Sequence, residues 1–379
     1  MLTEQISYHD AAWDMSPDTG FPRDKCQLVL VFSAPSLVCN ADIYDFVRAK
    51  YPQAHIITVS TSGEIYKEFV RDESVCVNAL YFEKTQIVVH ETEIDAMSES
   101  YSKWQELAQS LLGDKLRHVI VFSDGLQVNG SSLIQGMKEI LWTSIGLTGW
   151  LAGDSADFKE TFVAHNRVPN SKKMIIVIGF YGEYFQVGKW SVGGWDSFGQ
   201  KRLVTKSQDN IVYELDEKPV LDLYKTYLWD QAKDLPSSGL LFPLNIYEPW
   251  SDTSVVRTLL SINEDDKSIT FAWNVPQGYT AQLMKGNFNR IIGWAAQAAD
   301  TGITWMKHSS FALLVSCVGR KLVLWQRSEE EIEVIRNIIG NSVAIGWFYS
   351  YWEVWPSEHD ILDCQLHNQT MTLTLFWEL

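Results

Sequence analysis

The chain has 379 residues, of which 46% are hydrophobic and 21% are charged, and its formal net charge is −16. This length exceeds that of one ordinary core and predicts two folded units, and the hydrophobic content is sufficient to fill them. The excess of acidic residues argues against a nucleic acid or an anionic membrane as a partner, because phosphate groups require a basic surface.

The N-terminus and the cysteines predict a cytoplasmic location. The opening MLTEQISYHDAAWDM carries acidic residues and lacks the basic-then-apolar pattern of a signal peptide. No apolar run approaches the roughly 18 residues of a membrane span. The five cysteines are scattered, odd in number and without a CxxC pair, so we expect reduced thiols, no metal site and no cofactor.

Residues 1–24 lack periodicity and are expected to form an extension. From there the pattern alternates between buried strands and amphipathic helices. It predicts strands at 28–35, 54–65 and 117–127, helices at 41–52, 98–113 and 129–141, and a β-hairpin over 74–94.

Further strands are expected at 172–182 and 183–199, and a hairpin at 201–216 turns at Asp209-Asn210. We place a domain boundary near Leu215, where this hairpin ends. The second unit mixes strands with helices: strands at 255–275, 312–326 and 369–379, and helices at 216–235, 288–300 and 328–340. These elements predict a mixed α/β (α+β) protein with domains at 25–215 and 216–379, each a mixed β-sheet packed by helices.

Polar residues at the ends of apolar strands are the first candidates for a binding site. Ser123 and Asp124 end one such strand, and residues 60–64 are in the same situation, which is where ligands bind in α/β sheets. Glu64 could pair with an ammonium group. A turn, a helix cap or a solvated carboxylate is the alternative for each of them.

The segment from Ile145 to Asn166 is the second candidate. It combines glycines with short polar side chains, including Gly153, Asp154 and Ser155. Glycine allows the backbone to approach a ligand closely, and the polar side chains supply acceptors. A tight strand connection that requires glycine is the alternative.

Arg320 follows Gly319 and suits bidentate capture of a carboxylate, with a structural ion pair as the alternative. Cys317, three residues earlier, is a candidate nucleophile, but its strand-like surroundings favour a small buried hydrophobe. The chain has no P-loop, GxSxG, GxGxxG or HExxH pattern, and we assign no catalytic residue.

Several motifs, in order along the chain, resemble the two FIST domains. STSGEI (60–65), VFSDGL (121–126), NGSSLIQG (129–136), GWLAGDSADF (149–158) and VGGWDSFG (192–199) resemble the FIST N-terminal domain. KPVLDLYK (218–225), VPQGYTAQLM (275–284), LLVSCVGRKLVL (313–324), FYSYWE (348–353) and LHNQTMTL (366–373) resemble the FIST C-terminal domain.

This resemblance implies a cytoplasmic sensory module of signal transduction that binds a small ligand, such as an amino acid or a related metabolite, and acts on an unidentified signalling protein. An enzyme acting on a small metabolite and a scaffold without a ligand are the alternatives. The candidate ligand-binding residues are Ser62, Gly63, Glu64, Ser123, Asp124, Gly153, Asp154, Ser155, Arg320 and Glu353.

The chain departs from the family in its 16 tryptophans. Family members generally have glycine where this chain has Trp150, Trp229, Trp273, Trp325 and Trp352. A bulky residue at a glycine position costs about 1–3 kcal/mol in backbone strain. An aromatic cage for a cation and ordinary divergence are two explanations. We favour a third: some genetic codes read UGA as glycine, and translating such a gene with a table that reads UGA as tryptophan would produce this pattern.

Overall fold

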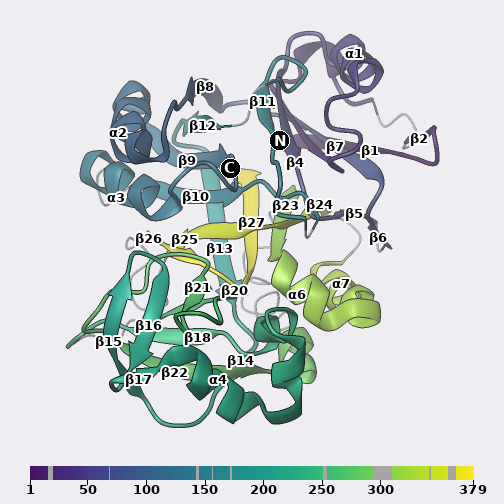
Figure 1. Cartoon of the computed structure of the whole chain (residues 1–379). Coiled ribbons are helices and arrows are strands. Elements are labelled where there is room, and N and C mark those ends of the chain that lie inside the picture. Colours follow the sequence, from purple (N-terminus) through teal and green to yellow (C-terminus); the bar gives the residue numbers. More distant parts are fainter. Residues whose placement is uncertain are drawn as a thin grey trace.

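The structure, a computed structural model, describes residues 1–15, 20–67, 69–141, 145–155, 157–170, 173–250, 254–293, 310–340, 343–356 and 364–379. Within this part of the chain, strands form three mixed sheets and one antiparallel sheet, with helices packed on their faces (Figure 1). This arrangement confirms the predicted mixed α/β class.

The first sheet carries helix α1 (Ala41–Lys50), whose Asn40 cap accepts hydrogen bonds from the first helical amides. The strand order is β11 (Val163–His165), β4 (His55–Ser60), β3 (Leu28–Ser33), β7 (Ser74–Tyr81), β1 (Leu2–His9) and β2 (Ala12–Met15). Strands β3 and β4 are parallel, as the intervening helix allows. The stretch expected as an extension contributes β1, which pairs with β7 along its whole length.

The second sheet packs against α2 (Ser100–Leu111) and α3 (Gly130–Ile140). Its strand order is β26 (Cys364–His367), β25 (Trp352–Pro356), β10 (Gly146–Leu151), β9 (Leu116–Ser123), β12 (Met174–Tyr181) and β8 (Gln86–Glu93). The pairing of β10 with β25 joins two segments that are about half the chain apart in sequence.

In the third sheet, α6 (Val318–Leu324) and α7 (Ser328–Ile339) connect two neighbouring parallel strands, and α7 packs on the sheet. Its strand order is β13 (Phe185–Val192), β27 (Met371–Glu378), β23 (Phe311–Cys317), β24 (Ala344–Ser350), β5 (Glu64–Tyr66) and β6 (Phe69–Arg71). Strands from both sides of the boundary expected near Leu215 therefore share this sheet as well as the second.

The fourth sheet, with α4 (Val220–Leu228), forms the lower lobe in Figure 1. Its main path runs β19 (Ser254–Arg257), β18 (Leu244–Tyr247), β22 (Thr280–Gly286), β15 (Arg202–Gln208), β16 (Ile211–Leu215), β21 (Ile269–Phe271) and β20 (Leu259–Ile262). Off this path, β14 (Trp195–Ser197) pairs with β22, and β17 (Lys218–Pro219) pairs with β16. The pairing of β15 with β16 confirms the hairpin predicted at 201–216.

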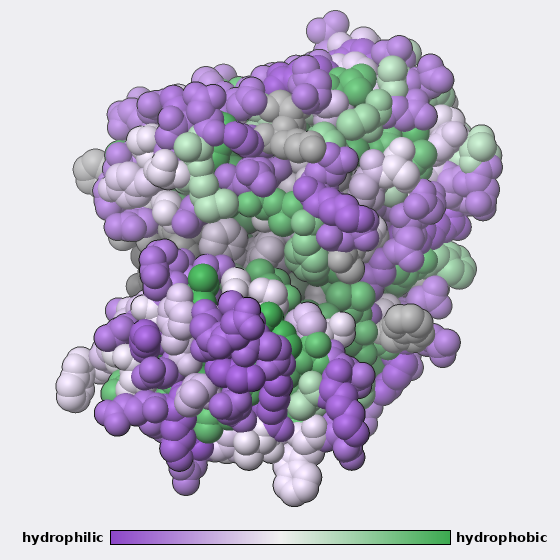
Figure 2. Space-filling view, in the orientation of Figure 1, coloured by the Kyte–Doolittle hydropathy of each residue, from purple (hydrophilic) through white to green (hydrophobic). Residues whose placement is uncertain are grey.

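The central core lies where the first three sheets meet. Phe32 of the first sheet stacks on Phe348 of the third with ring centroids 4.2 Å apart, and Phe122 of the second lies 6.3 Å from Phe32. All three rings are buried. Figure 2 shows the complementary pattern on one face, where hydrophilic side chains cover the upper and lower parts and hydrophobic residues gather in the hollow between them.

Two predictions are wrong: one in how two strands pair, and the other in the secondary structure of a segment. Residues 74–94 form two strands that do not pair as a hairpin, because β7 joins the first sheet and β8 the second. The predicted strand 312–326 ends at Cys317 and continues as helix α6, since its apolar residues also fit a helical face. The helix expected at 288–300 lies largely outside the described residues.

No helix within the described residues is both long and apolar enough to cross a membrane.

Candidate functional site

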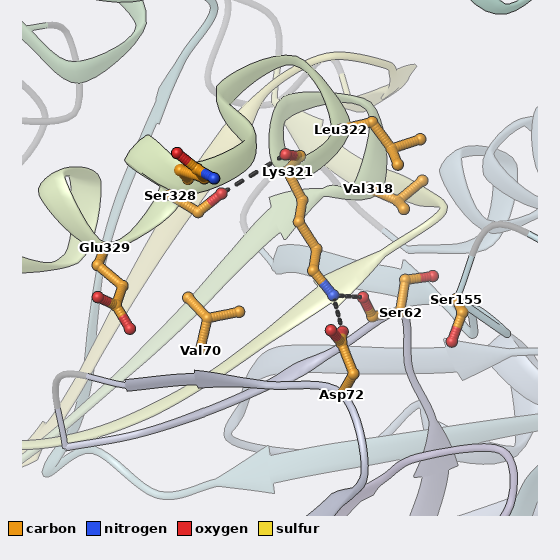
Figure 3. A pocket seen from close by; sticks show the side chains of 10 residues that line it. Ser62, Val70, Asp72, Ser155, Val318, Lys321, Leu322, Ser328 and Glu329 are labelled. Atoms are coloured by element: carbon orange, nitrogen blue, oxygen red, sulfur yellow. Dashed lines mark hydrogen bonds and ion pairs between the residues drawn. The ribbon is translucent and has the colours of Figure 1, made fainter.

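A cavity of about 610 Å³ lies between the β5–β6 region and helices α6 and α7 (Figure 3). Both polar and apolar side chains face it. Its lining consists of Ser62, Val70, Asp72, Ser155, Val318, Lys321, Leu322, Gln326, Ser328 and Glu329. We call this cavity the seam pocket.

Among the described residues that line the seam pocket, Lys321 of helix α6 is the only cation. Val318 and Leu322 are four residues apart and share a helical face, and Lys321 extends from the neighbouring position across the pocket (Figure 3). The Lys321 ammonium donates to the carbonyl of Ser62 at 2.8 Å and forms an ion pair with Asp72. The side chain of Asp72 is 67% exposed, so this pair is weak in water.

Two loops beside the pocket, one before β5 and one after β10, have glycines whose backbones lie very close to neighbouring side chains. Gly63 has φ +129°, and a Cβ there would lie 2.4 Å from the Lys321 Nζ. A Cβ on Gly153 would lie 2.3 Å from the Ser62 Oγ. Backbone hydrogen bonds from Ser62 to Tyr349 and from Gly153 to Ser60 hold the three segments together.

The Ser62 hydroxyl is a buried polar group on the pocket wall. Its Oγ has no hydrogen-bond partner among the described residues, and the residue is 0% exposed. A buried hydroxyl left without a partner costs about 1–3 kcal/mol.

Family profiles match both halves of the chain. The FIST N domain matches residues 27–218, and the FIST C domain matches residues 221–356. The chain belongs to the FIST family. FIST domains are generally regarded as sensory domains of signal transduction. No curated protein matches the sequence.

The seam pocket draws on both FIST domains. Ser62, Val70, Asp72 and Ser155 lie within the FIST N match, and the residues of α6 and α7 lie within the FIST C match. A molecule that filled the pocket would contact both domains.

The structure brings together one group of the predicted site residues. Ser62 and Ser155 line the pocket, and Gly63 and Gly153 shape the adjoining loops. Glu64 lies directly behind them, is fully buried, and accepts hydrogen bonds from Thr61 and Ser74. Burial raises the pKa of the Glu64 carboxyl to about 8, against the smaller lowering effect of these hydrogen bonds and of Lys321.

Asp154 and Asp124 organise loops. Asp154 accepts from the backbone amides of residues 158–160 and from the Tyr351 hydroxyl. Asp124 accepts from the amides of residues 126 and 127 and from Thr161, and burial raises its pKa. Ser123 donates to the carbonyl of Asp124 at 3.0 Å. The hydrogen bonds of Ser123 and Asp124 are of the kind expected from the turn and helix-cap alternatives for these two residues.

Arg320 and Glu353 are both buried away from the pocket. The Arg320 guanidinium pairs with Glu331 and donates to the carbonyls of Gly193 and Ile291. Glu353 accepts from Ser350 at 2.9 Å and from Thr370 at 2.8 Å. Burial raises the pKa of the Glu353 carboxyl to about 8. None of these residues lines the seam pocket.

Asp72, Lys321 and Glu329 line the pocket but were not among the residues predicted from the sequence. Because 312–326 was predicted to be a strand, the helix that places Lys321 beside Ser62 was not expected. The spacing of Val318 and Leu322 within that run was the available signal. Nothing in the sequence marks Asp72 as a neighbour of residues 249 positions later.

Among the described residues, no group of three His, Cys, Asp or Glu side chains is placed to hold a metal ion. Burial raises the pKa of the Cys317 thiol to about 12, which opposes formation of a nucleophilic thiolate.

Proposed function

We propose that this FIST protein is a cytoplasmic sensor that binds a small molecule carrying both a carboxylate and an ammonium group, such as an amino acid or a related metabolite, in the seam pocket. The observation that carries the proposal is the pairing of Lys321 with Asp72 beside the carbonyl of Ser62. These groups place a cation, an anion and a hydrogen-bond acceptor at one cavity.

An α-amino acid presents the same two charges as this ion pair. Its carboxylate would take the place of Asp72 beside Lys321, and its ammonium would pair with Asp72. The existing pair is largely exposed at Asp72, so exchanging it requires little free energy. The 610 Å³ volume falls in the range of small-molecule pockets.

The position of the pocket supports a signalling role. A ligand that contacts both FIST domains shifts their equilibrium if it binds one arrangement better than another. A separate signalling protein would then respond to that shift. The five cysteines are all free thiols, which is compatible with the reducing cytoplasm.

The test is isothermal titration and thermal shift of the full chain with free amino acids. A ligand at about 100 times its dissociation constant should raise the free energy of unfolding by about 2.7 kcal/mol. Lys321→Met should remove this stabilisation. Lys233→Met is the matched control, because Lys233 also pairs with an aspartate but on the open surface.

Two results would contradict the proposal. One is the absence of saturable binding by any amino acid or related metabolite. The other is equal binding by the Lys321→Met variant. Turnover of a bound compound would instead favour the enzyme alternative.

A further inference from the structure

We infer that the seam pocket selects a basic α-amino acid, of the lysine or arginine type, with Glu329 receiving the cationic end of the side chain. This inference rests on the proposed function and specifies its ligand class. Three features of the pocket carry it: its charge, the position of Glu329, and its apolar walls.

The charge of the pocket is not balanced by a neutral amino acid. Lys321 contributes one positive charge, and Asp72 and Glu329 contribute two negative charges. A zwitterion with an uncharged side chain satisfies Lys321 and Asp72 and leaves Glu329 unmatched. A basic amino acid carries one further positive charge and neutralises the set. The net charge of −16 also attracts a cationic ligand from solution.

Glu329 differs from the two acids that follow it in α7. Glu330 pairs with Arg327, and Glu331 pairs with Arg320. Among the described residues, no cation pairs with Glu329, although it lines the pocket. Its carboxylate is therefore available to a ligand.

The apolar walls suit the stem of a long side chain. Val70 lies in β6, Asp72 follows directly after that strand, and α7 packs against it. In Figure 3, Val70 lies between Asp72 and Glu329. Methylene groups that run from an ammonium at Asp72 to a cation at Glu329 would pass Val70. Lysine and arginine have such stems, which pack well on apolar surface.

The experiment compares ligands that differ only in the terminal charge. L-lysine is titrated against L-norleucine, which has the same length without the terminal ammonium, and L-arginine against the neutral L-citrulline. We expect the charged member of each pair to bind about ten-fold more tightly or better. Glu329→Gln should abolish that preference by weakening the binding of lysine and arginine. Glu330→Gln, one position along the helix, should leave the preference intact.

The possible outcomes separate the two proposals. If norleucine binds as tightly as lysine, or if Glu329→Gln keeps the preference, the basic-ligand inference is overturned while the amino-acid sensor stands. If no amino acid binds, both are overturned. A lysine preference that disappears in Glu329→Gln supports both.

Discussion

At the residue scale, Trp229 has a backbone conformation that ordinary side chains avoid. It ends α4 with φ 50° and ψ −119°, and its side chain is 82% exposed. Trp273 also has a positive φ, of 139°. Glycine adopts such conformations without strain. By contrast, Trp150 lies in a strand, is buried, and donates to Thr372 at 3.0 Å.

The first prediction concerns Trp229. We expect Trp229→Gly to be more stable than Trp229→Ala by about 1 kcal/mol, because both remove the indole and only glycine relieves the backbone. Urea unfolding of the two variants measures the difference. Trp13 in β2 is the control: it lacks a positive φ, so Trp13→Ala should be more stable than Trp13→Gly.

An alanine variant at 229 as stable as the glycine variant would remove the structural argument for recoding. The coding sequence gives an independent check. UGG codons at positions 150, 273 and 352 would end the recoding explanation, whereas UGA codons would support it.

The second prediction concerns Arg320 and Glu331. Both side chains are 0% exposed. Arg320→Met leaves a buried carboxylate without its cation and should lower the free energy of unfolding by about 3–5 kcal/mol. The double variant Arg320→Met/Glu331→Leu should recover most of that loss and retain the affinity for amino acids. A stable double variant that no longer binds them would instead show that Arg320 captures the ligand carboxylate.

At the element scale, periodicity predicted most helices but not the partners of the strands. The helix patterns at 41–52, 98–113 and 328–340 contain α1, α2 and α7, because each has an amphipathic face long enough to recognise. Alternation identified β7 and β8 as strands, but a period of two does not specify which sheet a strand joins. The contact of α6 with Asp72 could not be predicted either, because it is a tertiary contact that no local pattern specifies.

The third prediction tests β1, which the sequence left as an extension. Ile6 is 1% exposed within the β1–β7 pairing, whereas Leu2 on the same strand is 47% exposed. Ile6→Asp should lower the free energy of unfolding by about 3 kcal/mol or more, because it buries a carboxylate and removes apolar packing. Leu2→Asp should change it by less than about 1 kcal/mol. Equal, small effects in urea unfolding would show that β1 is dispensable.

At the scale of the whole molecule, two buried carboxylates lie where the FIST domains share sheets. Glu64 of β5 lies opposite Phe348 of β24 in the strand register. Glu353 of β25 lies opposite Trp150 of β10. Each accepts hydrogen bonds from hydroxyl groups. Burial raises the pKa of both carboxyls from 4.5 to about 8.

The fourth prediction follows from the sign of these shifts. Between pH 4.5 and about 8 the folded protein keeps protons on both groups that the unfolded chain has lost, so stability falls as pH rises and levels off above about 8. The buried His118 and the half-buried His55 and His165 have lowered pKa values and produce the opposite slope, mainly below their ordinary pKa of 6.5. The window from pH 6.5 to 8 therefore isolates the two glutamates from these histidines. There the free energy of unfolding should fall by up to roughly 3 kcal/mol per pH unit, at about 1.4 kcal/mol for each group.

Urea unfolding at several pH values in this window measures that slope. Glu64→Gln and Glu353→Gln should each remove about half of it, since an amide does not titrate, and Glu330→Gln on the exposed face of α7 should leave it unchanged. A slope that persists in the Glu64→Gln/Glu353→Gln double variant would show that other groups control the pH response. A slope that disappears would mean that the junction of the two FIST domains is most stable when both carboxyls are neutral, so that a rise in pH weakens the same junction that forms the seam pocket.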